Sequence, residues 1–137
     1  MASVTGNQRG VPDISMSAAC SGLVDTYQSF PGETAGWYVV CGTSEATPLF
    51  AGVVALADQV AHHPLGLINP ALYALKAEHA PGLVAVTTGN NTVGFTQNGK
   101  EYTVHGFSAS AQYNLASGVG TINASLFVPE LAVAASG

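Results

Sequence analysis

The most marked deficit in this sequence is charge. Charged residues make up 8% of its 137 residues, against roughly 25% in typical soluble domains. Three basic residues stand against eight acidic ones, giving a formal charge of −5 without any cluster of Lys or Arg. Basic patches are what bind phosphate backbones and anionic lipids, so we expect neither nucleic acid nor a membrane as a partner.

Long apolar runs and targeting segments are also missing. The longest apolar stretch, 39–57, is interrupted by Gly42, Glu45 and Pro48, so no segment is expected to span a bilayer. Residues 1–20 lack a basic start and an apolar centre, so no signal peptide is predicted in this chain. The few ionisable groups gain little charge on acidification, which favours an acidic, extracellular workplace.

Cysteine is scarce, with Cys20 and Cys41 the two in the chain. They either form one disulfide or remain small buried thiols, and the sequence leaves both states open. Two cysteines without a nearby histidine do not supply four ligands, so no structural metal site is expected.

What the chain does have is enough apolar residues, 47% of the total, for one domain with a core. The segment "RGVPDISMSA" (9–18) predicts a buried strand. "LVDTYQSFPG" and "GWYVVCG" predict two further strands joined by a turn through Pro31 and Gly32.

The apolar period changes after Gly42. Four apolar residues recur at i, i+4, i+7 and i+11, and these are Leu49, Val53, Leu56 and Val60. They predict one face of a helix from near Ser44 to about His62. Pro48 is tolerated only within the first turn, so the helix should begin close to Ser44.

The remaining elements are shorter. "NPALYALKAEHA" predicts a second helix, capped by Asn69 with Pro70 at its first position. "VAVTTGNNTVGFTQNGKEYTVHGF" predicts short strands with a turn at "QNGK". "YNLASGVGTINASLFVPELA" predicts a glycine-rich loop followed by a short helix.

Ser44 stands where strand gives way to helix. A serine there most simply caps the helix, as Thr43 could also do. As a nucleophile, it would gain from the positive end of the helix dipole and from free N–H groups that can hold an oxyanion. Gly42 permits a tight turn and a close substrate backbone, so we place Gly42 and Thr43 in the substrate or oxyanion vicinity.

The segment "GTSEATPLFAG" resembles the nucleophile segment of two related peptidase families, the subtilisins and the sedolisins. Four further segments, "RGVPDIS", "INPALYAL", "VTTGNN" and "YNLASGVG", are similar in order and spacing to the C-terminal part of sedolisins, the serine-carboxyl peptidases. This resemblance covers nearly the whole chain. It implies an α/β, subtilisin-like three-layer fold, with residues 1–137 as a single C-terminal portion lacking the N-terminal half.

The resemblance implies a secreted endopeptidase that cleaves polypeptides at acidic pH through an acyl-enzyme on its serine. In sedolisins a glutamate activates the serine, an aspartate one helical turn away supports that glutamate, and another aspartate completes the oxyanion hole. Ser44 matches the catalytic serine. The family carries the carboxylates upstream of "RGVPDIS", and this chain begins eight residues before that motif.

No substitute for these carboxylates is found. None of the five glutamates is followed four positions later by an aspartate, the spacing that would put both on one helix face. Glu45 follows Ser44 directly, but on a helix it projects about 100° away and fits a first-turn acid. The chain alone is therefore expected to be inactive.

The histidines are poorly placed to act as the base for Ser44. His62 and His63 end the helix that the candidate nucleophile begins, roughly 27 Å away at the usual helical rise. His79 fits the end of the second helix, where a cation is favoured. His105 is left as the base of a remote alternative, a subtilisin-like triad.

The family's calcium site is a further departure. Its positions correspond by register to Ala85, Val86, Ser110, Gln112 and Asn114. Calcium prefers about six to eight oxygens, carboxylates included, and the two carboxylate positions here read Ala85 and Asn114. We expect no calcium cofactor, and we expect Asn114 to bond to loop backbone instead. Cys41 also departs, since the family commonly has glycine there.

Two main interpretations remain. In the first, the chain is part of a sedolisin-like peptidase, extracellular by resemblance, and needs the N-terminal half for catalysis. In the second, it is a non-catalytic binding or structural relative of the peptidase scaffold. A sedolisin core is one central sheet of which this chain would supply the C-terminal strands, so strand edges and apolar faces should be bare, and we expect a homo-oligomer through an exposed sheet edge or a partner on that face. A homogeneous, monomeric fold would favour the second interpretation.

Overall fold

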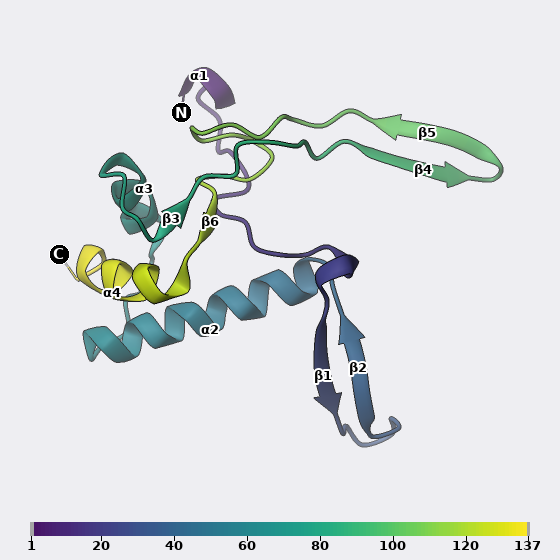
Figure 1. The fold of residues 1–137 in the computed structure, drawn as a ribbon, viewed down its shortest axis with the longest axis horizontal. Coiled ribbons are helices and arrows are strands. Elements are labelled where there is room, and N and C mark those ends of the chain that lie inside the picture. The colour runs from purple at the N-terminus through teal and green to yellow at the C-terminus, as the bar shows by residue number, and fades with distance from the viewer. Residues whose placement is uncertain (1, 137) are drawn as a thin grey trace.

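The computed structural model describes residues 2–136. Figure 1 shows a helical body from which two β-hairpins project in different directions. In chain order the elements are α1 (Ala2–Thr5), the 3-10 turn η1 (Cys20–Gly22), β1 (Val24–Gln28), β2 (Gly36–Val40), α2 (Thr43–Ala61), α3 (Asn69–Ala77), β3 (Leu83–Val84), β4 (Val93–Gln97), β5 (Lys100–Val104), β6 (Thr121–Ile122) and α4 (Ala124–Ala134).

The core lies where α2, α3 and α4 meet. Phe127 and Leu131 of α4 are fully buried, and Leu72 of α3 is 2% exposed. The ring of Phe50 on α2 lies 6.1 Å from that of Phe127, centroid to centroid. Burying each large apolar side chain stabilises the fold by about 1.5–3 kcal/mol, so these contacts hold the three helices together.

The helix predicted from Ser44 to His62 is confirmed as α2, but of the apolar face that predicted it only Val53 packs on the core. The other residues that pack on the core are each one position later and keep the same spacing: Phe50, Val54, Ala57 and Ala61. In the predicted stripe, Leu49, Leu56 and Val60 are 40%, 53% and 50% exposed. Both stripes are apolar, so periodicity alone did not decide which one packs.

The starts of α2 and α3 differ in detail from the prediction. Pro48 lies in the second turn of α2 rather than the first, which leaves the Ser44 carbonyl without its usual N–H donor. In α3 the N-cap is Ile68, so Asn69 is already helical and does not cap. The backbone of Ile68 is itself in the helical region, with φ −84° and ψ −9°, which moves the start back by one residue.

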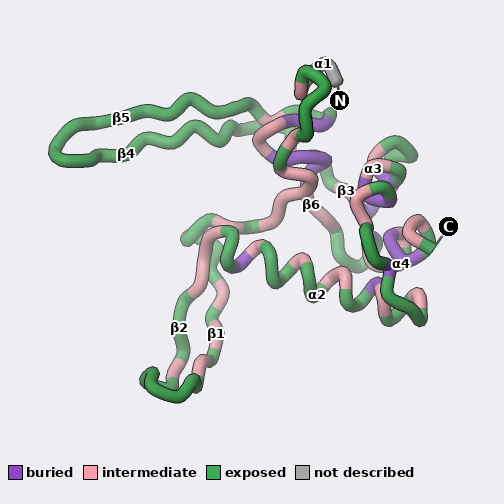
Figure 2. The backbone as a smooth tube through the Cα atoms, turned by 180° about the vertical axis from the view of Figure 1, so that it is seen from behind, coloured by how far each residue is buried: buried purple, intermediate pink, exposed green. Residues whose placement is uncertain are grey.

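All three sheets of residues 2–136 are two-stranded and antiparallel, pairing β1 with β2, β3 with β6 and β4 with β5. The predicted hairpins are confirmed. At the tip of β4–β5, Asn98 and Gly99 have φ of 53° and 74°, the backbone that a two-residue hairpin turn requires. Figure 2 shows this hairpin exposed along its length.

The strand predicted for residues 9–18 is wrong. This segment is irregular and makes two backbone contacts with the glycine-rich loop. The amide of Val119 donates to the carbonyl of Asp13 at 2.8 Å, and that of Ser15 donates to the carbonyl of Gly120 at 2.9 Å. Gly120 lies at a tight bend with φ 119°, so the pairing does not extend into a ladder.

The mixture of helices and strands agrees with the α/β class at the level of secondary structure. The glycine-rich loop and the closing helix are confirmed by residues 115–120 and α4. The three-layer, subtilisin-like arrangement stays a prediction. In the part of the chain that is described, no helix is long and apolar enough to cross a membrane.

Candidate active site

Ser44 lies in the first turn of α2, with its side chain exposed to solvent. The N-cap is Gly42, and no side chain caps the helix. The amides of Thr43 and Ser44 have no acceptor within the helix, because the first N–H groups of any helix lack one. An exposed hydroxyl therefore stands beside free donors at the positive end of a helix, so a nucleophile is compatible with this geometry and a capping role for Ser44 is not observed.

Gly42 determines the sharp turn into the helix. Its φ of 82° and ψ of −168° lie in a region that is essentially restricted to glycine. A Cβ at this position would meet no heavy atom within 4 Å. Backbone conformation is therefore the reason for glycine here, and the space beside it is open to a substrate backbone.

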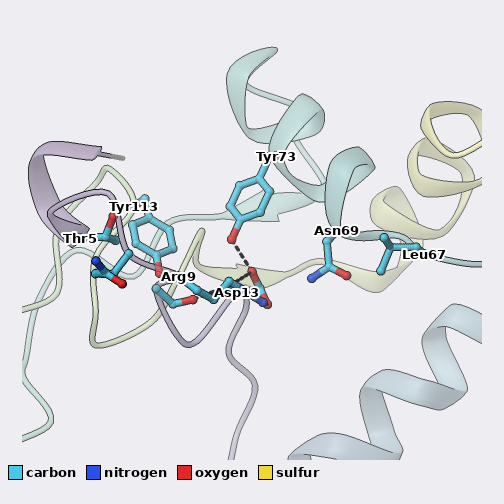
Figure 3. A pocket seen from close by; sticks show the side chains of 9 residues that line it. Thr5, Arg9, Asp13, Leu67, Asn69, Tyr73 and Tyr113 are labelled. Carbon is cyan, nitrogen blue, oxygen red and sulfur yellow. Dashed lines mark hydrogen bonds and ion pairs between the residues drawn. The ribbon is translucent and has the colours of Figure 1, made fainter.

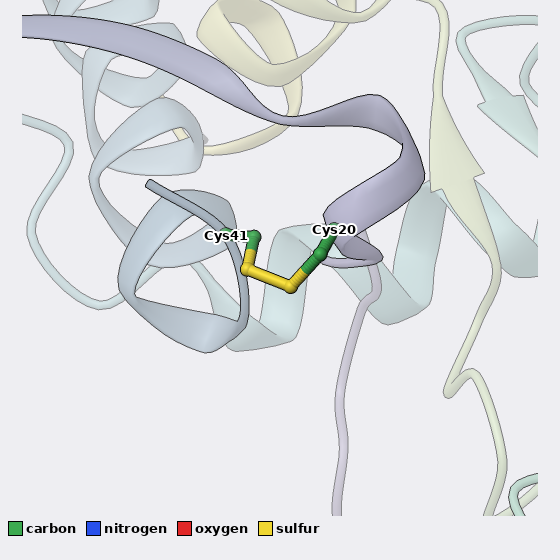
Figure 4. The surroundings of a disulfide bond; sticks show 2 residues. All are labelled: Cys20 and Cys41. Carbon is green, nitrogen blue, oxygen red and sulfur yellow. A yellow bond between two sulfur atoms is a disulfide. The ribbon is translucent and has the colours of Figure 1, made fainter. Parts of the chain in front are cut away.

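The start of α2 is held to the N-terminal segment at two points. The amide of Gly42 donates to the carbonyl of Ala18 at 2.7 Å, and Cys20 forms a disulfide with Cys41. Figure 4 shows this bond joining η1 to the residue just before the helix turn. Of the two cysteine states that the sequence left open, the structure has the disulfide, which closes the base of the β1–β2 hairpin next to Ser44.

Glu45 is turned away from solvent, unlike its neighbour Ser44. It is 3% exposed, and its Oε2 has no hydrogen-bond partner within residues 2–136. A buried carboxylate without a partner costs stability, and sequence reasoning missed it. Nothing in the sequence indicated this burial, neither the apolar residues at positions 46, 49 and 50 nor the position of the acid in the first helical turn.

The histidines lie elsewhere. His62 is the C-cap of α2, and His63 contacts the Ser136 hydroxyl at 3.2 Å and the Pro64 carbonyl at 3.0 Å. His79 follows α3, and His105 follows β5. None of the hydrogen bonds of the described residues joins a histidine to Ser44.

The positions that the family resemblance assigns to calcium are organised by Asn114, which is 5% exposed. Its side-chain nitrogen donates to the carbonyls of Ser110 at 3.0 Å and Gln112 at 3.1 Å. Its side-chain oxygen accepts the amides of Ala116 at 3.1 Å and Ser117 at 2.8 Å, and the Ser117 hydroxyl at 3.1 Å. The expectation that Asn114 bonds to loop backbone is confirmed.

These residues do not fit calcium. The amide nitrogen of Asn114 lies between the two carbonyls that a cation would have to bridge, and it is a donor where a cation needs oxygen. Ala85 supplies no side-chain ligand, and Val86 follows it after β3. Within the described residues no group of three or more His, Cys, Asp or Glu side chains is placed to hold a metal.

A separate cavity of about 410 Å³ lies between the N-terminal segment and α3 (Figure 3). There the Asp13 carboxylate accepts hydrogen bonds from Arg9 at 2.9 and 2.6 Å and from the Tyr73 hydroxyl. The bonds from Arg9, opposed in part by burial, hold the pKa of Asp13 below its usual range. Burial and the bond to Asp13 raise the pKa of Tyr73 to about 12. Asp13 therefore acts as an anchor for segment 9–15.

Comparison with known proteins gives one partial relative. Over 88 residues the chain is 38% identical to kumamolisin of Bacillus sp. (strain MN-32), a peptidase of the sedolisin family. The aligned part is 64% of this chain and 14% of that protein. No family model matches the chain, and no solved structure matches it. The chain thus has a partial homologue among sedolisin-family peptidases and spans a small part of its length.

Proposed function

We propose that this chain is the serine-bearing C-terminal part of a sedolisin-like serine-carboxyl peptidase, with Ser44 as the nucleophile. The observation that carries the proposal is the exposed, uncapped Ser44 in the first turn of α2, directly after the glycine-specific turn at Gly42. The partial match to kumamolisin supports the same family.

In the proposed reaction the Ser44 hydroxyl attacks a peptide carbonyl and forms an acyl-enzyme. The free amides at the start of α2, including that of Thr43, are suited to hold the oxyanion. The hydroxyl must lose its proton as it attacks, and serine is a weak nucleophile without an adjacent base. Because no carboxylate or histidine of the described residues bonds to Ser44, the base must come from polypeptide outside this sequence.

A carboxylate base implies an acidic optimum, because such a group works best near its own pKa. The disulfide between Cys20 and Cys41 supports an oxidising compartment, since disulfides persist mainly in secreted and extracellular proteins. We therefore propose an extracellular peptidase acting on polypeptides in acid. The low charge content of the chain, 8%, is compatible with that setting.

The test is a chimera in which this chain replaces the matching segment of kumamolisin. The chimera should hydrolyse a quenched fluorescent peptide at acidic pH, and Ser44→Ala should abolish turnover while leaving the thermal unfolding transition in place. Ala51→Ser, at an exposed position of α2 outside the proposed site, is the matched control and should retain activity. A folded chimera that is inactive, or whose activity survives Ser44→Ala, would contradict the proposal.

A further inference from the structure

The tip of the β4–β5 hairpin is formed by Asn98 and Gly99, a pair of residues that is chemically labile in water. Asparagine is among the thermolabile residues, because the backbone nitrogen of the following residue can attack its side-chain amide. The attack is fastest before glycine, which has no Cβ to shield that nitrogen. Of the seven asparagines in the sequence, Asn98 alone is followed by glycine. Even an added Cβ at Gly99 would meet nothing within 4 Å, so the nitrogen is unobstructed.

The hairpin leaves this tip in water and holds it weakly. All ten residues of β4 and β5 are exposed, and the hairpin projects from the helical body (Figure 1). The rings of Phe95 and Tyr102 stack on each other, with centroids 5.4 Å apart, so this aromatic packing lies within the hairpin. A two-stranded hairpin by itself is marginally stable in water at best. Opening of the tip therefore costs little free energy.

Opening is the step that makes the chemistry accessible. In the closed turn Asn98 and Gly99 have φ of 53° and 74°, and Gln97 pairs with Lys100 across the strands. The backbone must rotate out of this turn before the Gly99 nitrogen reaches the side-chain carbonyl carbon of Asn98. The Asn98 side chain makes no hydrogen bond within residues 2–136, so no contact of its own holds the amide in place.

We propose that Asn98 is a site of spontaneous covalent modification, namely deamidation through a cyclic imide with Gly99. The Gly99 backbone nitrogen loses its proton and bonds to the side-chain carbonyl carbon of Asn98, and the side-chain nitrogen leaves as ammonia. Water then opens the five-membered imide at one of its two carbonyls, which leaves aspartate or isoaspartate. The reaction consumes water alone and needs neither an oxidant nor a cofactor.

Both products change the hairpin tip. Each adds one carboxylate, and so one negative charge, to a chain whose formal charge is already −5. Isoaspartate also routes the main chain through the former side-chain carbon, which lengthens the turn. A two-residue hairpin turn fixes the register of its strands, here the pairing of Gln97 with Lys100. The isoaspartate product therefore loosens the hairpin from its tip.

The reaction should depend on pH through the attacking backbone nitrogen. That nitrogen must be deprotonated, so the rate rises with hydroxide concentration and is low in acid. The titratable side chains of the hairpin strands are Lys100, Glu101 and Tyr102, and none of them bonds to the Asn98 side chain. The tip should therefore persist at acidic pH and change at neutral and alkaline pH. This inference is independent of the proposed catalytic role of the serine at the start of α2.

The test is peptide mapping by mass spectrometry after the full 137-residue chain has been kept at mildly alkaline pH and, in parallel, at acidic pH. The alkaline sample should gain about 1 Da at Asn98, the mass difference between an amide and an acid, and the acidic sample should not. Asn90 and Asn123 are internal controls, because both are exposed but precede larger residues; they should stay intact. Asn98→Gln keeps an amide but needs a six-membered ring, so it should remain unmodified.

A synthetic peptide of residues 94–102 gives the rate for an open turn. The rate at Asn98 in the chain should lie within about tenfold of it, since tenfold corresponds to an opening free energy of about 1.4 kcal/mol. A slower rate in the chain overturns the proposal, because the closed turn would then protect the site. So does conversion at Asn90 and Asn123 as fast as at Asn98, or conversion at Asn98 that is as fast in acid as in alkali.

Discussion

The side-chain nitrogen of Asn114 lies 3.0 Å from the carbonyl oxygen of Ser110 and donates a hydrogen bond to it. The same nitrogen donates to the carbonyl of Gln112. The side-chain oxygen accepts hydrogen bonds from the amides of Ala116 and Ser117 and from the Ser117 hydroxyl. A neutral amide thus joins the two carbonyls that the family resemblance assigns to calcium. The loop closes by hydrogen bonding within the chain itself.

We therefore predict that Asn114→Ala destabilises the chain by about 2–4 kcal/mol, because several buried backbone groups lose their partners. Gln112→Ala is the matched control: it keeps the carbonyl that Asn114 uses, removes an exposed side chain, and should change stability little. Urea unfolding measures both. Millimolar calcium should not raise the melting temperature of the wild-type chain, and a rise of several degrees that Asn114→Ala abolishes would show that the loop does bind the ion.

Asp13 should make stability depend on pH in the acidic range. Its folded pKa lies below the ordinary value because of the bonds from Arg9, so its contribution is complete above the unfolded pKa and is lost as pH falls through the folded one. Asp13→Asn should cost about 1–2 kcal/mol at neutral pH and nearly nothing at the acid end. Urea midpoints at several pH values test this.

Reducing the Cys20–Cys41 disulfide should lower stability by about 3 kcal/mol, the loop-entropy value for a link of this length, given a sequence separation of 21. Urea unfolding with and without a thiol reductant measures the loss. The Cys20→Ala, Cys41→Ala double variant should unfold like the reduced chain and should no longer respond to reductant. Two titratable thiols in oxidised, denatured wild-type chain would contradict the bond.

The turn before Ser44 should tolerate no side chain. Gly42→Ala must hold a glycine-only backbone conformation and should cost about 1–3 kcal/mol, although the added methyl group meets no atom. Gly36→Ala at the start of β2 is the control, since its Cβ would lie 4.0 Å from the Tyr38 ring and its φ is not positive. Equal unfolding midpoints for Gly42→Ala and the wild type would remove the strain argument.

The local elements near Ser44 were predictable because their signals are local. The glycine before Ser44 and the proline after it limited the start of α2, and the Asn98–Gly99 pair marked the β4–β5 turn. What could not be predicted depends on contacts distant in sequence. Either of two apolar stripes on α2 could have faced the core. The helix α4 packs on the stripe that contains Phe50, and α4 follows more than sixty residues later in the chain.

The strand predicted for 9–18 failed for a related reason. An apolar segment becomes a strand only where a neighbour offers a ladder, and segment 9–18 meets a tight glycine loop at Gly120. At the candidate site, the position of Ser44 followed from sequence, and the bonding of Asn114 followed from its residue type. The burial of Glu45 did not, because a first-turn acid is usually solvated.

If Ser44 is a nucleophile whose base lies outside this sequence, as we propose, the isolated 137-residue chain should lack peptidase activity. Hydrolysis of a quenched fluorescent peptide should be undetectable between about pH 3 and pH 8, because loss of the groups that cooperate with a catalytic serine costs on the order of 10⁶ in rate. The Ser44→Ala variant should likewise show no detectable hydrolysis. Turnover by the isolated chain that disappears in Ser44→Ala would contradict the claim and place a working base among these residues, with His105 the first to replace.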